Sequence, residues 1–173
     1  MTTKQVHDIL KVAAWIIFIG LCVEAGAKLV SVIISLFVSE EGASNLYRGM
    51  DLSALYASDK VHFGVMAILI IIIPVLKAYL FFWVIRITSN INIAEPFSEY
   101  NAGLILKMSK ISLEIGLASF AANSYAGWIE TNLVKVPFEG NGTEYLFLAG
   151  ILFIIEQIFK RGIELKAEND LTI

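Results

Sequence analysis

Hydrophobic residues gather into long stretches of this sequence, and shorter polar segments separate them. A helix that crosses a membrane needs roughly 20 predominantly apolar residues, and these stretches are about that long or longer. They predict an all-α chain, an integral membrane four-helix bundle that forms one transmembrane domain over residues 1–173. The expected spans cover about residues 12–38, 61–87, 103–129 and 144–161, followed by a cytoplasmic tail over 162–173.

The first stretch also has features of a signal peptide, because lysines precede an apolar core and Ala25-Gly26-Ala27 would suit cleavage. The apolar run nevertheless continues to Val38, which is long enough to cross a bilayer. We therefore expect a membrane span here rather than a cleaved leader.

The third stretch carries small residues at alternating spacings of three and four, which places them on one helix face. These residues are Ser109, Ser112, Gly116, Ser119, Asn123 and Ala126. A stripe of small side chains lets membrane helices approach closely. A second face is small except where it is charged, with Lys107, Lys110, Glu114, Ala118, Ala121 and Tyr125. Two such faces predict a central helix, and the stripe predicts close packing or a homo-oligomer.

Lysines and arginines are distributed unevenly between the segments that connect the spans. With a cytoplasmic N-terminus, the inside segments hold Lys4, Lys11, Arg86, Lys107, Lys110, Lys160, Arg161 and Lys166. The outside segments then hold Arg48, Lys60 and Lys135. Because cytoplasmic loops are enriched in these residues, both termini are expected on the cytoplasmic side.

Four charged residues fall near the middle of the expected spans: Glu24, Lys28, Lys77 and Glu114. Each would cost about 2.5–3.5 kcal/mol at a helix centre in a bilayer, so an internal polar network is expected. Glu24 and Lys28 have the i,i+4 spacing of a helical ion pair, and Lys77 and Glu114 would then pair between helices. The balanced charges favour a structural clasp. The alternative is a small ion- or proton-coupled transporter that uses Glu24 and Glu114. Glu156 is expected to pair with Lys160 or Arg161.

The composition excludes several classes of function. The chain has 173 residues, of which 57% are hydrophobic and 17% charged, and its net charge of −3 argues against direct nucleic-acid binding. One cysteine, Cys22, excludes a disulfide framework and a cysteine metal site. No Ser-His-Asp set, metal-ligand cluster or phosphate loop is present in the sequence, so we expect neither an enzyme nor a bound cofactor or metal.

Two polar motifs flank the last two spans. Glu95-Pro96-Phe97-Ser98-Glu99-Tyr100-Asn101 leads into the third, and Gly162 to Ile173 closes the chain with E-L-K-A-E-N-D-L-T-I. With four spans at this length, these motifs resemble an uncharacterised bacterial family of four-helix membrane proteins whose ending is E-L-x-x-E-N-D-L-T-[IV]. The resemblance implies the bacterial cytoplasmic (inner) membrane and a role in membrane-linked regulation. Because the family is often encoded beside a Cro/CI-type helix-turn-helix regulator, it also implies such a regulator as a cytoplasmic partner.

The C-terminal tail contains too few large apolar residues to form a core of its own. The purely structural interpretation is a solvated helix end, or a cap that folds back onto the loop that contains Pro96 and Phe97. The functional hypothesis is a docking peptide built from loop 88–101 and the tail, because short segments with spaced leucines can fill a groove on a partner. The expected partner-binding residues are Pro96, Phe97, Glu164, Leu165, Asn169, Asp170 and Leu171.

Overall fold

The structure, a computed structural model, describes residues 3–90 and 96–170, and over these residues it is entirely helical. The prediction of an all-α chain is confirmed. The helices are α1 (Thr3–Phe37), the short 3₁₀ helix η1 (Glu40–Ser44), α2 (Ser53–Ser58), α3 (Lys60–Asn90), α4 (Glu99–Asn132) and α5 (Gly142–Asp170).

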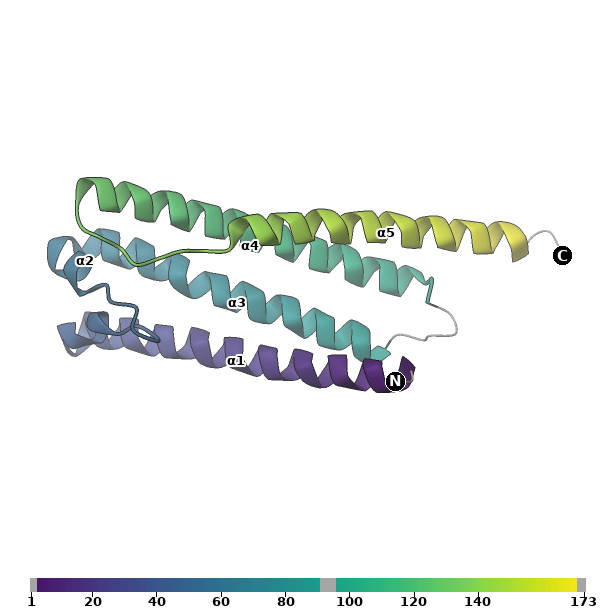
Figure 1. The fold of residues 1–173 in the computed structure, drawn as a ribbon, viewed down its shortest axis with the longest axis horizontal. Helices are drawn as coiled ribbons and strands as arrows, with labels where there is room; N and C mark the ends of the chain where they lie inside the picture. Colours follow the sequence, from purple (N-terminus) through teal and green to yellow (C-terminus); the bar gives the residue numbers. More distant parts are fainter. Residues whose placement is uncertain (1–2, 91–95, 171–173) are drawn as a thin grey trace.

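The long helices pack one after another along the chain: α1, α3 and α4 lie side by side in Figure 1, and α5 lies across α4 in that view. α1 packs against α3, α3 against α4, and α4 against α5, whereas α1 and α5 make no backbone approach to each other in the described residues. The prediction that the third long helix is central is therefore confirmed, because α4 lies between α3 and α5. α5 begins partway along α4 and projects past the ends of the other helices.

Two hydrophobic clusters hold the helices together. One lies where α2 covers the first half of α3, and it buries Leu55, Phe63, Met66 and Ile129 completely. The other lies between the second half of α3, the first half of α4 and α5. Its members from α3 and α4 are Leu80, Trp83, Leu104, Met108, Ile111 and Ile115, and Tyr145, Leu148 and Leu152 of α5 pack against them.

The small-residue stripe of α4 is the surface on which α5 packs. The Ser109 hydroxyl donates a hydrogen bond of 2.8 Å to the Ala149 carbonyl oxygen. A Cβ added at Gly116 would lie 2.6 Å from Leu146 Cδ2, so the backbones approach closely there. The second face expected to pack closely does so only in part. Lys110, Glu114 and Ala121 are exposed, whereas Lys107 lies over the Trp83 ring of α3 at 4.1 Å and Tyr125 contacts His62. Most of the contact between α3 and α4 is apolar.

Two of the described helices are long and apolar enough to cross a membrane, at Gln5–Phe37 and Lys60–Ser89. In the most apolar window of the first, 11% of the residues are buried inside the protein, against 39% in the second. Most apolar side chains of α1 therefore point away from the rest of the chain. In α4, Lys107, Lys110 and Glu114 interrupt the apolar sequence.

Asp59 caps the start of α3 at the end of the molecule that also holds α2. Its Oδ1 accepts hydrogen bonds from the His62 and Val61 amides at 3.0 and 2.7 Å. These two bonds, that from His62 first, lower the pKa of the Asp59 carboxyl below its ordinary value of 3.8. His62 Nδ1 lies 2.6 Å from the Tyr125 hydroxyl, which ties the capped turn to α4.

Asp59→Ala is expected to lower the melting temperature at neutral pH, because it removes the acceptor for two amides at the helix start. A carboxyl whose folded pKa is depressed stabilises the fold above its unfolded value, and this contribution disappears as the pH falls through the folded pKa. The difference between wild type and variant should therefore be largest well above pH 3.8 and shrink below it. Melting curves at a series of pH values test this, and a pH-independent difference would contradict it.

Candidate functional site

A lateral groove runs over α3 between α1 and α5, because these two outer helices do not meet. It consists of two neighbouring hollows of about 440 and 210 Å³, whose walls share Lys77 and Asn141. The larger lies between α3 and α5, and the smaller between α1, α3 and the segment 138–141. The walls of the groove gather charged side chains from three segments: Glu24 and Lys28, Lys77, and Glu139 and Glu144.

Glu24 and Lys28 line the α1 side of the lateral groove. Lys28 Nζ lies 2.6 Å from Glu24 Oε1, and the lysine side chain is 7% exposed against 30% for the glutamate. The predicted i,i+4 pair is confirmed. Both side chains also border a hollow with Tyr47, Arg48 and Pro137, which belong to connecting segments. The pair therefore lies beside polar loops rather than midway along an apolar bundle.

The segment before α5 folds back along α4 and is fixed there by one side chain. Asn123 Nδ2 donates to the Gly140 carbonyl at 2.9 Å, and its Oδ1 accepts from the Gly140 amide at 2.8 Å. A Cβ at Gly140 would lie 3.2 Å from the Ser119 Cβ, so the close approach favours glycine. This anchoring places Asn141 and Glu144 at the edge of the lateral groove, where Asn141 Nδ2 donates to Glu144 Oε1 at 3.3 Å.

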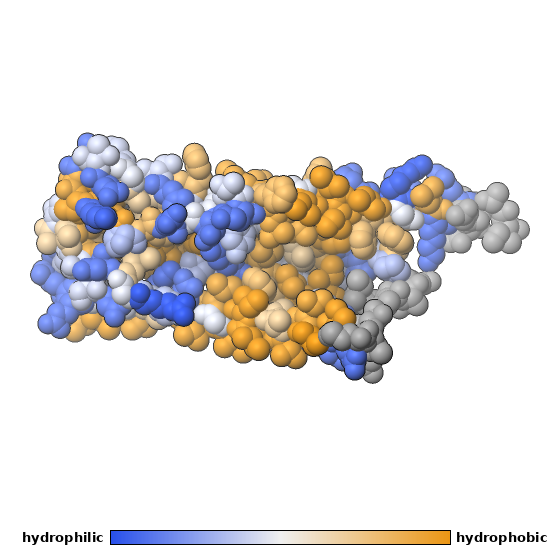
Figure 2. Space-filling model, in the orientation of Figure 1, coloured by the Kyte–Doolittle hydropathy of each residue, from blue (hydrophilic) through white to orange (hydrophobic). Residues whose placement is uncertain are grey.

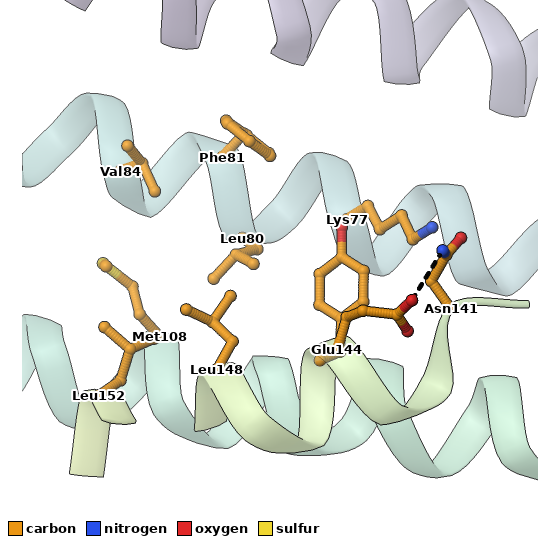
Figure 3. A pocket seen from close by; sticks show the side chains of 10 residues that line it. Lys77, Leu80, Phe81, Val84, Met108, Asn141, Glu144, Leu148 and Leu152 are labelled. Atoms are coloured by element: carbon orange, nitrogen blue, oxygen red, sulfur yellow. Dashed lines mark hydrogen bonds between the residues drawn. The ribbon is translucent and has the colours of Figure 1, made fainter. Parts of the chain in front are cut away.

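Lys77 projects from α3 into the same space (Figure 3). Its Nζ lies 5.0 Å from the centre of the Tyr145 ring, within the range of a cation–π interaction. Figure 3 shows Lys77, Asn141 and Glu144 together at one end of the hollow, while Leu80, Val84, Met108, Leu148 and Leu152 line the other. The larger hollow is thus polar at one end and apolar at the other.

Glu114 does not belong to this group, and the prediction that it pairs with Lys77 is wrong. Its side chain is exposed, and no ion pair or hydrogen bond to it is found among the described residues. The reason is geometric: α4 turns Ser112 and Ile115 inward, so Glu114 between them lies on the exposed side of the helix and does not line the groove. The structure brings together Glu24, Lys28 and Lys77 and leaves Glu114 outside.

Glu156 is a buried acid on α5, with 1% of its side chain exposed. The Lys160 Nζ lies 2.7 Å from its Oε1, and Gln157 Nε2 donates to its Oε2 at 2.6 Å. The predicted pairing with the lysine one turn later is confirmed.

Of the residues expected to bind a partner, those that the structure describes lie at one end of the molecule, in the second half of α5 and beside it. The Phe97 ring packs against the Phe159 ring with centroids 5.2 Å apart, and a Cβ at Gly162 would lie 2.6 Å from Phe97 Cδ1. Pro96 is half-buried beside it and accepts a hydrogen bond of 2.9 Å from Asn101 Nδ2. The segment 96–98 therefore rests on α5 at the base of the tail.

Beyond Gly162 the tail continues as helix through Asp170. Glu164 forms an exposed ion pair of 2.7 Å with Arg161, and Leu165 is 46% exposed. Asn169 and Asp170 belong to the last turn of α5, and Leu171 lies outside the described residues. In its described part the tail continues α5 as helix, and the loop packs at the base of the tail, against Phe159 and Gly162.

The sequence does not predict four polar residues of the lateral groove: Glu139, Asn141, Glu144 and Tyr145. The turn-forming Gly140-Asn141-Gly142 marks a connection but does not show that the connection folds back along α4. Asn123 is the one visible signal, because a side-chain amide within a stripe of small residues has to find hydrogen-bond partners.

No group of three or more histidine, cysteine, aspartate or glutamate side chains in the described part of the chain could hold a metal ion. No protein-family model, curated protein or solved structure matches this chain.

Proposed function

We propose that the chain is a multi-pass protein of the bacterial cytoplasmic membrane, in which α1, α3, α4 and α5 all cross the bilayer. The exposed apolar surface of α1 supports this placement. In the most apolar 18-residue stretch of α1, 11% of the residues are buried within the protein, and the lipid of a bilayer would cover the apolar side chains that remain exposed. On the face of the molecule shown in Figure 2, hydrophobic residues gather over the half along which α5 lies, and polar residues lie at both ends.

The helices are longer than the bilayer is thick. At 1.5 Å per residue, the 35 residues of α1 span about 52 Å, compared with roughly 30 Å for the hydrocarbon core. The end that holds α2 therefore lies outside the membrane, on the side opposite both termini. The bias of lysine and arginine supports cytoplasmic termini.

Labelling of single cysteines in intact cells tests this topology. Cys22 is replaced by serine, and cysteine is introduced at Arg48, Lys135 or Glu168. A membrane-impermeant maleimide should label positions 48 and 135 in intact cells, and position 168 after permeabilisation. Labelling of position 168 in intact cells, or of position 135 only after permeabilisation, would contradict the four-span arrangement.

We further propose that the protein is a non-catalytic regulatory or interaction protein that docks a cytoplasmic partner on the projecting end of α5. The observation that carries this proposal is that α5 extends past the other helices (Figure 1), with Phe97 packed at the base of the extension. Residues 164–168 are all exposed there, including Leu165. A rigid helix that presents an apolar side chain between charged ones suits helix-in-groove recognition.

The family resemblance suggests a helix-turn-helix regulator as that partner. The test is affinity capture from native membranes with the tail present and with the chain ended after Ile163. Recovery of the same cytoplasmic protein with both chains would contradict docking by the tail.

The alternative of an ion- or proton-coupled transporter receives less support from the geometry. Glu24 is held by Lys28 at 2.6 Å, and Glu114 lies on the exposed face of α4 away from the lateral groove. A relay that uses both acids would need them to share one path. Measurement of proton uptake by vesicles that contain the purified protein distinguishes the two proposals, because a docking protein should show none.

A further inference from the structure

The larger hollow of the lateral groove has one polar end and one apolar end, as an amphiphilic ligand does. It has a volume of about 440 Å³, its polar end holds Lys77, Asn141 and Glu144, and its apolar end is lined by Leu80, Leu148 and Leu152 (Figure 3). It opens sideways between α3 and α5, and these helices do not approach each other closely in the described residues. A bilayer lipid could therefore enter from the membrane without any rearrangement of helices.

The polar end holds one cation, Lys77, and one anion, Glu144, and these two side chains do not form an ion pair with each other. Lys77 forms no ion pair among the described residues and has the Tyr145 ring as its neighbour, whereas Lys28 neutralises the nearby Glu24. Glu144 accepts one hydrogen bond from Asn141. A cation and an anion at the same end match a head group that carries both a phosphate and an ammonium.

The direction of the hollow fits a lipid of the outer leaflet. Glu144 lies in the first turn of α5, while Leu148 and Leu152 follow one and two turns further toward the cytoplasmic end. On α3, Leu80 likewise follows Lys77 toward that end. In the membrane placement proposed above, the polar end therefore faces the outer surface and the apolar end faces the bilayer interior.

We propose that the lateral groove binds one ethanolamine phospholipid of the outer leaflet. The phosphate lies against the Lys77 ammonium, the lipid ammonium against the Glu144 carboxylate, and one acyl chain along Leu80, Leu148 and Leu152. The proposal rests on the membrane placement and does not depend on docking of a partner by the tail.

Native mass spectrometry of the full chain, extracted in detergent and mixed with defined lipids, tests the proposal. Wild type should retain one phosphatidylethanolamine per chain in preference to phosphatidylglycerol. Lys77→Leu should lower retention at least tenfold, and Glu144→Gln should remove the preference for ethanolamine. Lys110→Leu is the matched control, because Lys110 is an exposed cation on α4 outside the groove and its loss should change nothing.

A second variant keeps the proposal testable if Lys77→Leu does not fold. Leu148→Trp fills the apolar end without altering the charges, and it should abolish retention while circular dichroism shows unchanged helix content. Equal retention by wild type and all three groove variants, or an equal affinity of wild type for both lipids, would overturn the lipid site. A chain that is recovered in solution without detergent would overturn the membrane placement itself.

Discussion

On the proposed docking role, a chain that ends after Ile163 should no longer bind a cytoplasmic partner but should keep its stability. The residues removed lie on the part of α5 that projects beyond the other helices, and those at 164–168 are exposed. The ion pair between Arg161 and Glu164 would be lost, but both side chains are more than half exposed, and such pairs contribute little. We expect the free energy of unfolding to change by less than about 0.5 kcal/mol. Recovery of the partner should fall at least tenfold.

Ending the chain after Ile163 rather than earlier preserves the contact between Phe97 and Gly162, so the base of the tail is not disturbed. A pair of point variants sharpens the test. Leu165→Gln should reduce capture, whereas Ala167→Gln, on the same exposed helix, should not. A large loss of melting temperature on truncation, with no partner captured by the full chain, would assign the tail to packing instead.

Gly116→Leu should destabilise the detergent-solubilised protein. A Cβ at this position would lie 2.6 Å from Leu146 Cδ2 and 3.1 Å from the Leu146 backbone nitrogen. Leu146 could rotate away from a methyl group, but the additional carbons of a leucine would force α4 and α5 apart. Separation of the two helices would also strain the hydrogen bond between Ser109 and Ala149, which lies in the same interface between α4 and α5. Overpacking of this kind costs about 1–3 kcal/mol, and occasionally more.

Gly103→Leu is the matched control for this prediction, because a Cβ at Gly103 would meet nothing within 4 Å. Both glycines are inside α4, so both substitutions gain about the same helix propensity of roughly 0.8–1 kcal/mol. Gly103→Leu should therefore leave the melting temperature unchanged or raise it. Equal effects of the two variants would show that α4 and α5 do not pack at Gly116.

Local patterns in the sequence predict which residues of α4 pack, but not how many neighbours the helix has. Small residues at spacings of three and four share one face by helix geometry alone, and Ser109, Gly116 and Ser119 do lie against α5 or the segment before it. The charged face of the same helix cannot be assigned in this way. Lys110 and Glu114 could face a partner helix or the surroundings, and they face the surroundings.

The ion pair between Glu24 and Lys28 was predictable because it requires only two residues spaced four apart on one helix. The pairing of Lys77 was not predictable, because it depends on where α5 starts along α4. Nothing in the spacing of residues shows that the segment 133–141 folds back beside α4, which brings Asn141 and Tyr145 to Lys77 in place of Glu114.

A long helix covers each of the four stretches expected to cross the membrane, but among the described helices two, α1 and α3, are long and apolar enough to do so, and the helices differ from the expected spans in length. α1 and α5 each begin or end well outside the predicted apolar stretches, at Thr3 and at Asp170. Hydrophobicity marks what a membrane can cover, whereas a helix continues into water wherever hydrogen bonds and capping allow. The tail is the clearest example, because its polar composition suggested a peptide and the structure makes it part of α5.

Photo-crosslinking from position 165 in living cells tests the central claim most directly, since it asks what the projecting end of α5 touches. A photoreactive amino acid at Leu165 should give a discrete adduct with one cytoplasmic protein. The same amino acid at Ile158, which is exposed on α5 at the level of the apolar surface, should give none. Adducts of position 165 with lipid or with the chain itself, and with no other protein, would contradict the account.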